Sequence, residues 1–313
     1  MNYLKDYREG EKFVGTYLCK QKQILKTKAG KTYYSLTLQD KTGTADGKIW
    51  ELNNGIANFE PMDYIHCEGM VTSFQGNLQM NISRVRISDE GEYDPADYVP
   101  CTNKDVGEMF SRILKYVASV QNKYLRKILE MYFVENKEFV DAFKKHSAAK
   151  SVHHGFMGGL LEHTLSVTDM CQYFAEHYPM IHRDLLITAA LFHDMGKIQE
   201  ISDFPMNDYT DDGQLLGHIY IGARCMENAA AQIPNFPPKL KNELVHCILA
   251  HHGKMEFGSP KVPAIMEAMA LHMADNADAK LQTLTEVFTQ AGDNMGWLGF
   301  NRMFESNLRK TSE

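Results

Sequence analysis

The sequence contains no closely spaced pair of cysteines. Its six cysteines fall singly along the chain, and none belongs to a CxxC motif. This distribution argues against a disulfide framework and against a structural zinc site, and it favours a reducing compartment. The segment Met1–Glu11 is charged and lacks the apolar stretch of a secretory signal peptide. We therefore expect a cytoplasmic protein.

Long apolar runs and an excess of basic charge are also missing. The longest nearly apolar stretch, Leu185–Phe192, is far too short to span a bilayer, so we expect no membrane partner. The chain has 33 Lys and Arg against 40 Asp and Glu, a net charge of −7. Averaged over the whole chain, this balance disfavours a polyanionic ligand.

The charge is unevenly distributed, however. Residues 1–90 contain 12 basic and 11 acidic side chains, whereas residues 91–313 contain 21 and 29. The acid excess lies entirely in the second part, which also contains 12 of the 13 histidines. The first part thus remains able to bind phosphates, and the second part concentrates side chains that bind cations.

Residues 1–90 predict a small β-barrel. Five β-rich runs are separated by turn-prone segments, and a short helix is expected near Asn53–Asn58. The runs are Phe13–Leu18, Thr32–Leu38, Ala45–Trp50, Tyr64–Ser73 and Leu78–Ile87. Five strands within about 80 residues fit a Greek-key barrel of OB type, and another small β-barrel fits almost as well.

The remainder of the chain predicts helices. Residues 91–104 contain two prolines and no apolar periodicity, which is typical of a linker. From Asp105 onward, apolar residues recur at the helical period. We expect a helical connector over 105–150, an all-helical domain over 151–280 and a C-terminal helical extension over 281–313. The predicted fold class is multidomain, a β-barrel followed by an all-α part.

Histidine and aspartate recur on the predicted helices in the order His, His-Asp, His, His-His, Asp. Each lies in or beside an apolar stretch, where a buried carboxylate is costly unless a cation compensates it. Imidazole and carboxylate together suit a divalent ion such as Mn, Fe, Zn, Co or Ni. Any one histidine alone is better explained as a core or capping residue, but the ordered set predicts a metal centre. Its members are His163, His193, Asp194, His218, His251, His252 and Asp275.

This ordered set resembles the HD-domain superfamily of metal-dependent phosphohydrolases. The implied ligands of a first metal are His163, His193, Asp194 and Asp275. The implied added ligands of a second metal are His218 and His251. The resemblance also implies that Asp194 bridges the two ions and takes part in catalysis through them. Such a pair of ions activates water for the hydrolysis of a phosphoester.

The resemblance implies roles for the neighbouring side chains as well. Lys197 stands where the HDxGK stretch of the superfamily places a lysine that meets a substrate phosphate, and His252 is expected to contact that phosphate or to support a ligand. Trinuclear HD-GYP members carry a glutamate at the position of Gly159, so we expect no third metal. We expect Ser166 to be a packing residue. For Asp278 the alternatives are a surface charge of its helix, which is favoured, and a group that supports a metal ligand.

Aromatic and basic side chains lie close together in the predicted barrel, and OB folds bind single strands by stacking bases beside a basic groove. No acidic residue occurs between Lys20 and Leu38. Because side chains alternate along a strand, one of Tyr33 and Tyr34 should point inward and the other outward. The alternative is that the aromatics fill the core and the lysines solvate an edge strand. The candidate contacts are Lys28, Lys31, Tyr33, Tyr34, Trp50 and Phe74.

A second basic cluster comes shortly before His163. Three glycines between residues 155 and 159 follow it and would let the backbone approach a substrate closely. A solvated loop is the alternative explanation, but the position beside a presumed metal ligand favours contact with a phosphate. The candidate nucleic-acid contacts here are Lys150, His153 and His154.

Over about residues 5–310 the chain resembles the bacterial YhaM family. The segments that carry the resemblance are Lys28–Asp40, His153–Thr164, Gly213–Ile219 and Leu249–Gly253. The resemblance implies a 3′-to-5′ exoribonuclease that is active with manganese or cobalt and can also degrade single-stranded DNA. Without it, the residues indicate only a metallophosphoesterase with a barrel suited to nucleic acid.

We therefore predict a metal-dependent 3′-to-5′ exoribonuclease that binds single-stranded RNA, and single-stranded DNA as a second substrate, and releases nucleoside 5′-monophosphates. The expected cofactor is one or two divalent ions, with Mn²⁺ favoured over Co²⁺, Fe²⁺ and Ni²⁺. A homo-oligomer is left open. The alternatives are an HD phosphohydrolase of small nucleotides, a nucleic-acid-binding factor with a vestigial HD site, and a di-iron HD oxygenase.

Overall fold

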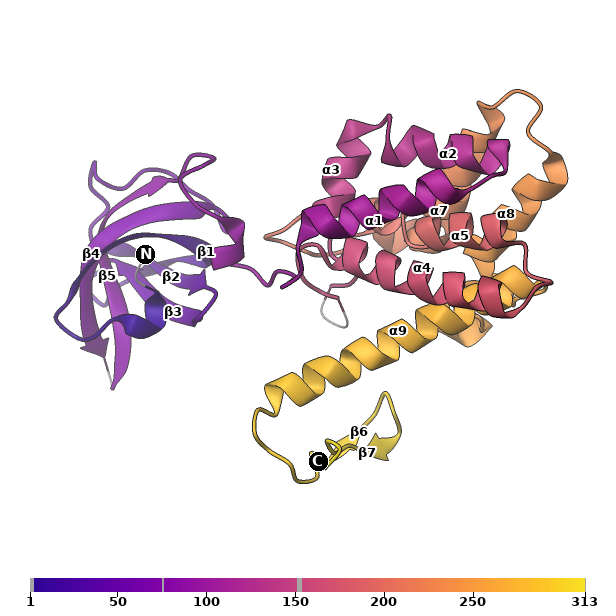
Figure 1. The fold of residues 1–313 in the computed structure, drawn as a ribbon. Coiled ribbons are helices and arrows are strands. Elements are labelled where there is room, and N and C mark those ends of the chain that lie inside the picture. The colour runs from indigo at the N-terminus through magenta and orange to yellow at the C-terminus, as the bar shows by residue number, and fades with distance from the viewer. Residues whose placement is uncertain (1–2, 75, 151–153, 313) are drawn as a thin grey trace. The chain divides into compact units, whose positions relative to one another are not determined.

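Alternating apolar residues close the N-terminal strands into a barrel (Figure 1). The strands are β1 (Lys12–Lys26), β2 (Thr32–Asp40), β3 (Gly43–Ile49), β4 (Tyr64–Phe74) and β5 (Asn77–Ile87). Their order around the barrel is β1-β2-β3-β5-β4, with β3 and β5 parallel and every other neighbouring pair antiparallel. This five-stranded arrangement is an OB fold, so the predicted barrel is confirmed.

The computed structural model describes residues 3–74, 76–150 and 154–312. The chain divides into two units, Met1–Cys101 and Thr102–Glu313, and each contains its own hydrophobic core. The barrel unit extends into the predicted linker, because Tyr98 and Val99 are buried in it at 2% and 3% exposure. Only the last residues of that predicted linker therefore belong to the helical unit.

The prediction of a helix near residues 53–58 is wrong, because the chain forms a turn there. The side chain of Asn53 accepts a hydrogen bond from the Gly55 backbone N–H at 2.8 Å, and Ile56 forms a parallel bridge with Val85 of β5. An asparagine that closes a turn in this way offers the backbone an alternative to a helix. The segment therefore lies along the barrel wall as a turn followed by a single bridge.

The second unit is helical. Its helices are α1 (Val106–Ser119), α2 (Lys123–Phe133), α3 (Lys137–Lys145), α4 (Gly159–His177), α5 (Arg183–Phe192), α6 (Lys197–Glu200), α7 (Asp211–Ala231), α8 (Pro238–Ala250) and α9 (Met266–Gln290). The predicted connector over 105–150 is not separate, because side chains such as Ile113, Leu125 and Phe143 belong to the same core as α4 and α5. Within the described residues, every helix is too short or too polar to cross a membrane.

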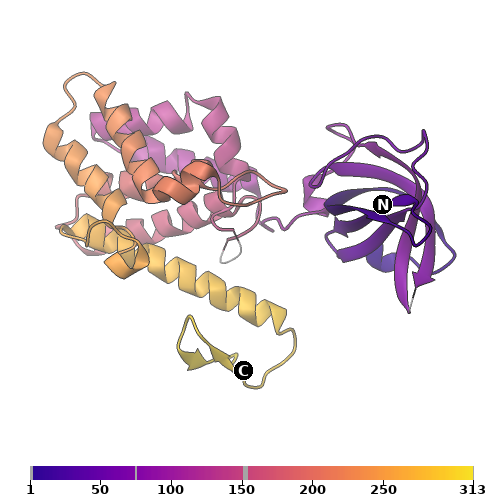
Figure 2. The same cartoon turned by 180° about the vertical axis from the view of Figure 1, so that it is seen from behind.

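The C-terminal extension is only partly helical, which corrects the prediction for 281–313. The N-terminal half of α9 packs against α4, α5 and α8, and its C-terminal half extends beyond them (Figures 1 and 2). After Gln290 the chain forms a two-stranded sheet of β6 (Phe300–Asn301) and β7 (Ser306–Asn307). Gly292 has a φ of 52°, and this left-handed conformation ends the helix. Residues other than glycine rarely adopt it.

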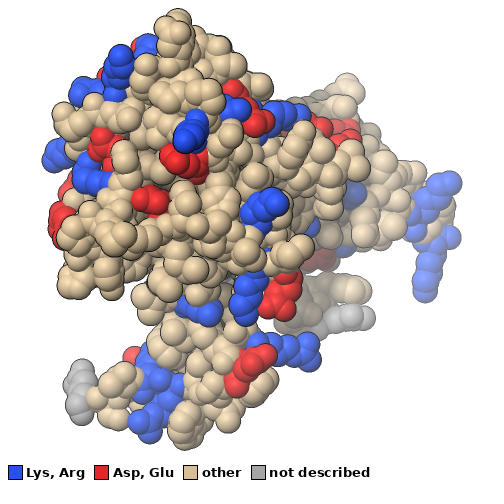
Figure 3. Space-filling model, turned by 90° about the vertical axis from the view of Figure 1, so that its right-hand side faces the viewer, with Lys and Arg blue, Asp and Glu red and all other residues tan. Residues whose placement is uncertain are grey.

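Charge is mixed on the surface that Figure 3 presents. Over most of it, lysine and arginine are interspersed with aspartate and glutamate, whereas at the right-hand edge basic side chains have no acidic neighbour in view. On most of this face, therefore, no large field of one sign is present. A nucleic acid bound here would depend on particular side chains rather than on the average charge.

Candidate active site

Helices far apart in the sequence bring the predicted metal ligands together. They are His163 on α4, His193 and Asp194 directly after α5, His218 on α7, His251 directly after α8 and Asp275 on α9. The helix α7 is interrupted just before its ligand, since Gly217 has a φ of 72° and a ψ of 152°. Only glycine adopts this backbone conformation readily, so Gly217 lets the chain turn His218 into the site.

The first cluster consists of two histidines and two aspartates. The Nε2 atom of His163 lies 3.1 Å from His193 Nε2, 3.2 Å from Asp275 Oδ1 and 3.4 Å from Asp194 Oδ2. His193 Nε2 lies 3.4 Å from the same Asp194 oxygen. Except for the partly exposed Asp275, these side chains are buried, with His193 at 0% exposure. Two imidazoles and two carboxylates thus converge on one small volume.

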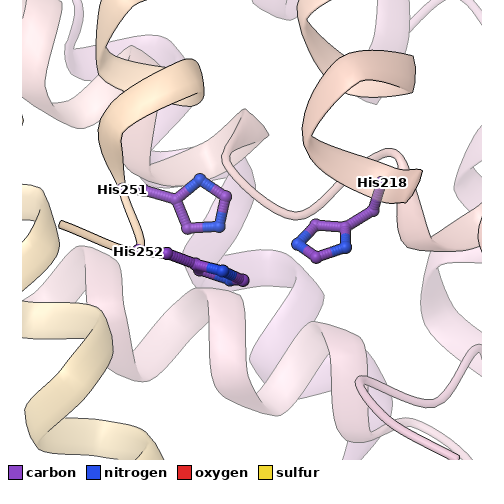
Figure 4. Close-up of side chains that lie close together, drawn as sticks. All are labelled: His218, His251 and His252. Atoms are coloured by element: carbon purple, nitrogen blue, oxygen red, sulfur yellow. The ribbon is translucent and has the colours of Figure 1, made fainter. Parts of the chain in front are cut away.

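A second cluster lies on the other side of Asp194. The Asp194 Oδ1 atom lies 3.5 Å from His218 Nε2 and 3.6 Å from His251 Nε2. The ring of His252 approaches both of these histidines, and Figure 4 shows the three imidazoles turned toward one another. One ligand atom from each of the three lies within 4.8 Å of the others. Asp194 therefore offers one oxygen to each cluster.

Each of these five histidines is oriented by a hydrogen bond at the opposite ring nitrogen. The acceptors of Nδ1–H are Asp278 Oδ2 for His163, the Ala190 carbonyl for His193, Glu200 Oε1 for His218, the Ile248 carbonyl for His251 and the Phe257 carbonyl for His252, at 2.6 to 2.9 Å. Carbonyl and carboxylate oxygens only accept, so Nδ1 carries a proton, and in the neutral ring Nε2 is then the nitrogen that can bind a cation. This arrangement is typical of histidines that bind metal.

The polar atoms at the centre fit a cation. Among the described residues, Asp194 Oδ1, His218 Nε2 and His251 Nε2 are buried and form no hydrogen bond. The Nε2 atoms of His163 and His193 lie 3.1 Å apart, so a proton or a metal ion is needed between them. Buried polar atoms without partners are costly, and a divalent ion with nitrogen and oxygen ligands satisfies all of them.

The local pKa shifts have the same origin. Burial disfavours the charged form of Asp194, but Lys197 and His193 hold the pKa of this carboxyl well below its usual range. The Lys197 Nζ atom lies 2.6 Å from Asp194 Oδ2, and although burial opposes the charged ammonium, Asp194 raises the pKa of Lys197. Burial, together with the neighbouring His251, lowers the pKa of His252 to about 4, so its ring is neutral near pH 7. Lys197 thus remains a cation and His252 a neutral donor or ligand.

A cleft of about 350 Å³ opens beside the two clusters. Its lining includes His218, His252 and Asp275 together with Lys197, so a bound molecule can reach both the ligands and the cation. Two aromatic side chains, Tyr209 and Phe257, also line it. The site therefore combines a buried polar centre with an open cavity on one side.

Comparisons with known proteins agree with this arrangement. The family described as HD domain matches residues 160–280. The chain is 32% identical to the 3′-5′ exoribonuclease YhaM of Bacillus subtilis (strain 168), over 82% of this chain and 81% of that protein. It is also 32% identical to YhaM of Listeria innocua, over 91% of this chain and 90% of the relative.

The chain belongs to the YhaM family of 3′-5′ exoribonucleases. The predicted family and the predicted HD domain are thereby confirmed. Among solved structures, the second OB-fold domain of replication protein A from Methanococcus maripaludis matches with a TM-score of 0.24 and 20% identity, over 29% of this chain and 98% of that chain.

In this YhaM-family chain, Asp278 is a buried partner of the metal site, which corrects its prediction as a surface charge. It is 7% exposed and accepts hydrogen bonds from His163 Nδ1 at 2.6 Å, from His154 Nε2 at 3.0 Å and from Ser166 Oγ. These donors outweigh burial and hold the pKa of Asp278 far below its usual range. Ser166 is accordingly a hydrogen-bond donor rather than a packing residue.

The prediction that His154 contacts nucleic acid is also corrected. His154 is 2% exposed, so its ring cannot stack on a strand, and instead its Nε2 atom bonds the same Asp278 oxygen as His163. Its backbone explains Gly159 as well, because a Cβ at that position would lie 2.0 Å from the His154 carbonyl oxygen. No side chain fits there, which excludes a glutamate ligand at this position. His153 lies outside the described residues.

Replacing Asp278 by asparagine is expected to weaken Mn²⁺ binding by about 10- to 100-fold, because the amide cannot orient His163 as a carboxylate does. Calorimetric titration of Mn²⁺ and activity as a function of Mn²⁺ concentration measure the effect. Saturating metal should restore most of the activity. Asp293→Asn, at an exposed position after α9, is the matched control. An unchanged Mn²⁺ dependence would show that Asp278 does not position His163.

Glu200 is a candidate site residue that the sequence did not indicate. Its Oε1 atom accepts hydrogen bonds from both the backbone N–H and the Nδ1–H of His218, each at 2.9 Å. These bonds to His218 outweigh the effect of burial and lower the pKa of Glu200. Glu200 follows His193 by seven positions, and no sequence motif links the two. Its contact with His218 is revealed only by the packing of α6 against α7.

The barrel candidates fall into two groups. Tyr33 stacks on Trp50 with ring centroids 4.6 Å apart, and Trp50 is 41% exposed. Tyr34 instead packs against the barrel core, edge-on to Phe59 and beneath the ammonium of Lys22. The expectation of one outward and one inward tyrosine is met. Because the Tyr34 ring packs against the barrel core, it is withdrawn as a stacking residue.

The remaining candidates lie at the surface. Lys28 is exposed, and Phe74 is 62% exposed at the end of β4. Lys31 forms a surface ion pair with Glu51 at 3.2 Å, and Lys150 forms one with Asp208 at 2.6 Å. Ion pairs as exposed as these contribute little stability, so both lysines can exchange their partner for a phosphate.

Proposed function

We propose that this chain removes nucleotides from the 3′ end of single-stranded RNA at the HD centre. One observation carries the proposal: four histidines, each held at Nδ1, present Nε2 to a single carboxylate, Asp194. Membership of a family of named exoribonucleases supports the polarity and the substrate. Phosphodiester hydrolysis needs no serine or cysteine nucleophile at such a centre.

The two clusters would hold two divalent ions, with Mn²⁺ as the favoured metal. The proposed first set is His163, His193, Asp194 and Asp275, and the proposed second set is His218, His251 and Asp194. His252 lies close enough to complete the second set. Divalent ions bound there would activate water and offset phosphate charge. The protein side chains fix where the scissile phosphate must lie.

Lys197 is proposed to stabilise the charge that develops on the phosphate. Its ammonium is buried beside Asp194 and faces the cleft, so it needs little reorganisation when a phosphate arrives. His252, neutral and held by the Phe257 carbonyl, would contact the same phosphate or bind the second ion. Asp194 would take part in catalysis because its two oxygens belong to the two sets, so both ions would lie beside the same scissile phosphodiester bond.

The barrel is proposed to bind the strand. Its contacts would be the stacked pair Tyr33 and Trp50, the exposed Phe74, and phosphate contacts from Lys28 and Lys31. Base stacking tolerates any sequence, and lysine–phosphate contacts weaken as salt rises. Binding should therefore show little sequence preference and should fall with ionic strength. A cytoplasmic location is part of the proposal, because six cysteines without a CxxC pair favour a reducing compartment.

A single assay tests the proposal. Single-stranded RNA labelled at the 5′ end is incubated in Mn²⁺ with either a free or a blocked 3′ end. The free end should yield progressively shorter labelled products and nucleoside 5′-monophosphates, and the blocked end should stay intact. Parallel reactions with Co²⁺, Fe²⁺ and Ni²⁺, and with single-stranded DNA, rank metals and substrates. Turnover of mononucleotides with no shortening of RNA would refute the exonuclease assignment.

A further inference from the structure

The cleft beside the metal ligands has two exposed aromatic walls that the hydrolysis of a phosphate does not require. Tyr209 is 45% exposed and Phe257 is 56% exposed, yet both line the same cavity as Lys197 and Asp275. Aromatic rings that serve a hydrophobic core are buried, as Phe133 and Phe143 are in this unit. Tyr209 and Phe257 therefore do not serve this core, and what sets them apart from an exposed aromatic such as Tyr178 is that they line the cavity.

Each ring is held in place by its own segment. Tyr209 pairs with Ile201 in an isolated antiparallel bridge, immediately before α7. Phe257 ends the short 3₁₀ helix Met255–Phe257, and its carbonyl oxygen accepts the 2.9 Å hydrogen bond from His252 Nδ1. The backbone that carries Phe257 is thus tied directly to a side chain of the metal centre.

A lysine accompanies each ring. The Lys150 ammonium lies 5.9 Å from the centroid of Tyr209, and the Lys254 ammonium lies 5.2 Å from the centroid of Phe257. An exposed ring beside a cation is the combination that single-stranded nucleic acids use, because the ring stacks on a base while the cation meets the backbone. The cavity of about 350 Å³ is of the size that binds a small molecule or a single nucleotide.

We propose that Tyr209 and Phe257 bind the nucleobase of the 3′-terminal nucleotide by stacking. This contact would determine how far the 3′ end of the strand enters the cleft. This inference rests on the proposed exonuclease function and names the part of the substrate that the cleft receives. With the base against these rings, the adjoining phosphate lies at Lys197 and the metal ligands. Stacking accepts every base, so the pocket recognises the presence of a base rather than its identity.

The test compares two RNA strands that differ only at the 3′-terminal nucleotide, which is either normal or abasic. Wild-type protein in Mn²⁺ should show a KM on the order of 10- to 100-fold higher for the abasic end, with a smaller change in kcat. In the double variant Tyr209→Leu/Phe257→Leu, the KM for the normal end should rise to the abasic value. The single variant Phe257→Tyr, with Tyr209 unchanged, keeps an aromatic ring at both positions and should retain the preference for the strand with a normal 3′-terminal base.

Leucine keeps apolar bulk but lacks a flat ring, so the variants isolate stacking. Tyr178→Leu, at a 50% exposed position at the end of α4 and outside the cleft, is the control and should behave as the wild type. Equal KM values for both ends in the wild type, or a double variant that still prefers the normal end, would overturn the inference. Failure of the wild type to shorten either strand would instead refute the proposed function itself.

Discussion

Asp194→Asn is expected to lower kcat by about 1,000-fold or more in the Mn²⁺-dependent RNA assay, because this carboxylate offers one oxygen to each of the two clusters. Its two oxygens lie 3.4 to 3.6 Å from four histidine Nε2 atoms. Asparagine has nearly the same shape but carries no charge, and its amide nitrogen cannot bind a cation. The variant should therefore lose metal as well as activity.

Calorimetric titration with Mn²⁺ separates this result from a folding defect. Wild-type protein should bind the ion with measurable heat, and Asp194→Asn should show little or none while its circular dichroism spectrum is unchanged. Asp141→Asn, at an exposed position on α3, is the matched control. If Asp194→Asn kept wild-type activity, hydrolysis would have to take place at a site other than this centre.

Lys197→Met is expected to lower kcat by roughly 100- to 1,000-fold, which is the effect of removing one preorganised group that stabilises transition-state charge. Methionine keeps an unbranched stem in the space that Lys197 fills and removes only the ammonium. Since Asp194 raises the pKa of Lys197, the wild-type side chain stays charged across the neutral range, and the loss should not depend on pH there.

The two variants differ in their metal binding. In Lys197→Met the negative charge of Asp194 is no longer neutralised by the ammonium, so this variant should bind Mn²⁺ at least as tightly as the wild type. Asp194→Asn should not bind the ion. Lys239→Met, exposed on α8, controls for loss of a lysine from the helical unit. Weaker Mn²⁺ binding in Lys197→Met would assign this lysine a structural role instead of one in the reaction.

The sequence predicted those features that short-range pattern determines. Alternating apolar residues between Phe13 and Ile87 defined the strands of the barrel, and helical periodicity defined α4, α5, α8 and α9. The ordered set of histidines and aspartates predicted which side chains meet, and the structure brings all of them together. In each case the residue type and its spacing carry the information.

The features that the sequence did not predict depend on packing between distant elements. Asp278 lies 115 positions from His163, and only the contact between α4 and α9 buries it beside that histidine. Glu200 acquires its role because α6 packs on α7, and His154 acquires its role because its loop crosses Gly159. Tyr209 and Phe257 belong to segments without periodicity, so no pattern marks them as walls of a cleft.

The separate hydrophobic cores of the two units have a thermodynamic consequence. Heating should unfold the barrel and the helical unit in two cooperative transitions instead of one. Metal ions that bind only the native helical unit raise the temperature of that transition by mass action and leave the other unchanged. Removal of metal by a chelator should therefore destabilise the helical unit, while the barrel stays folded.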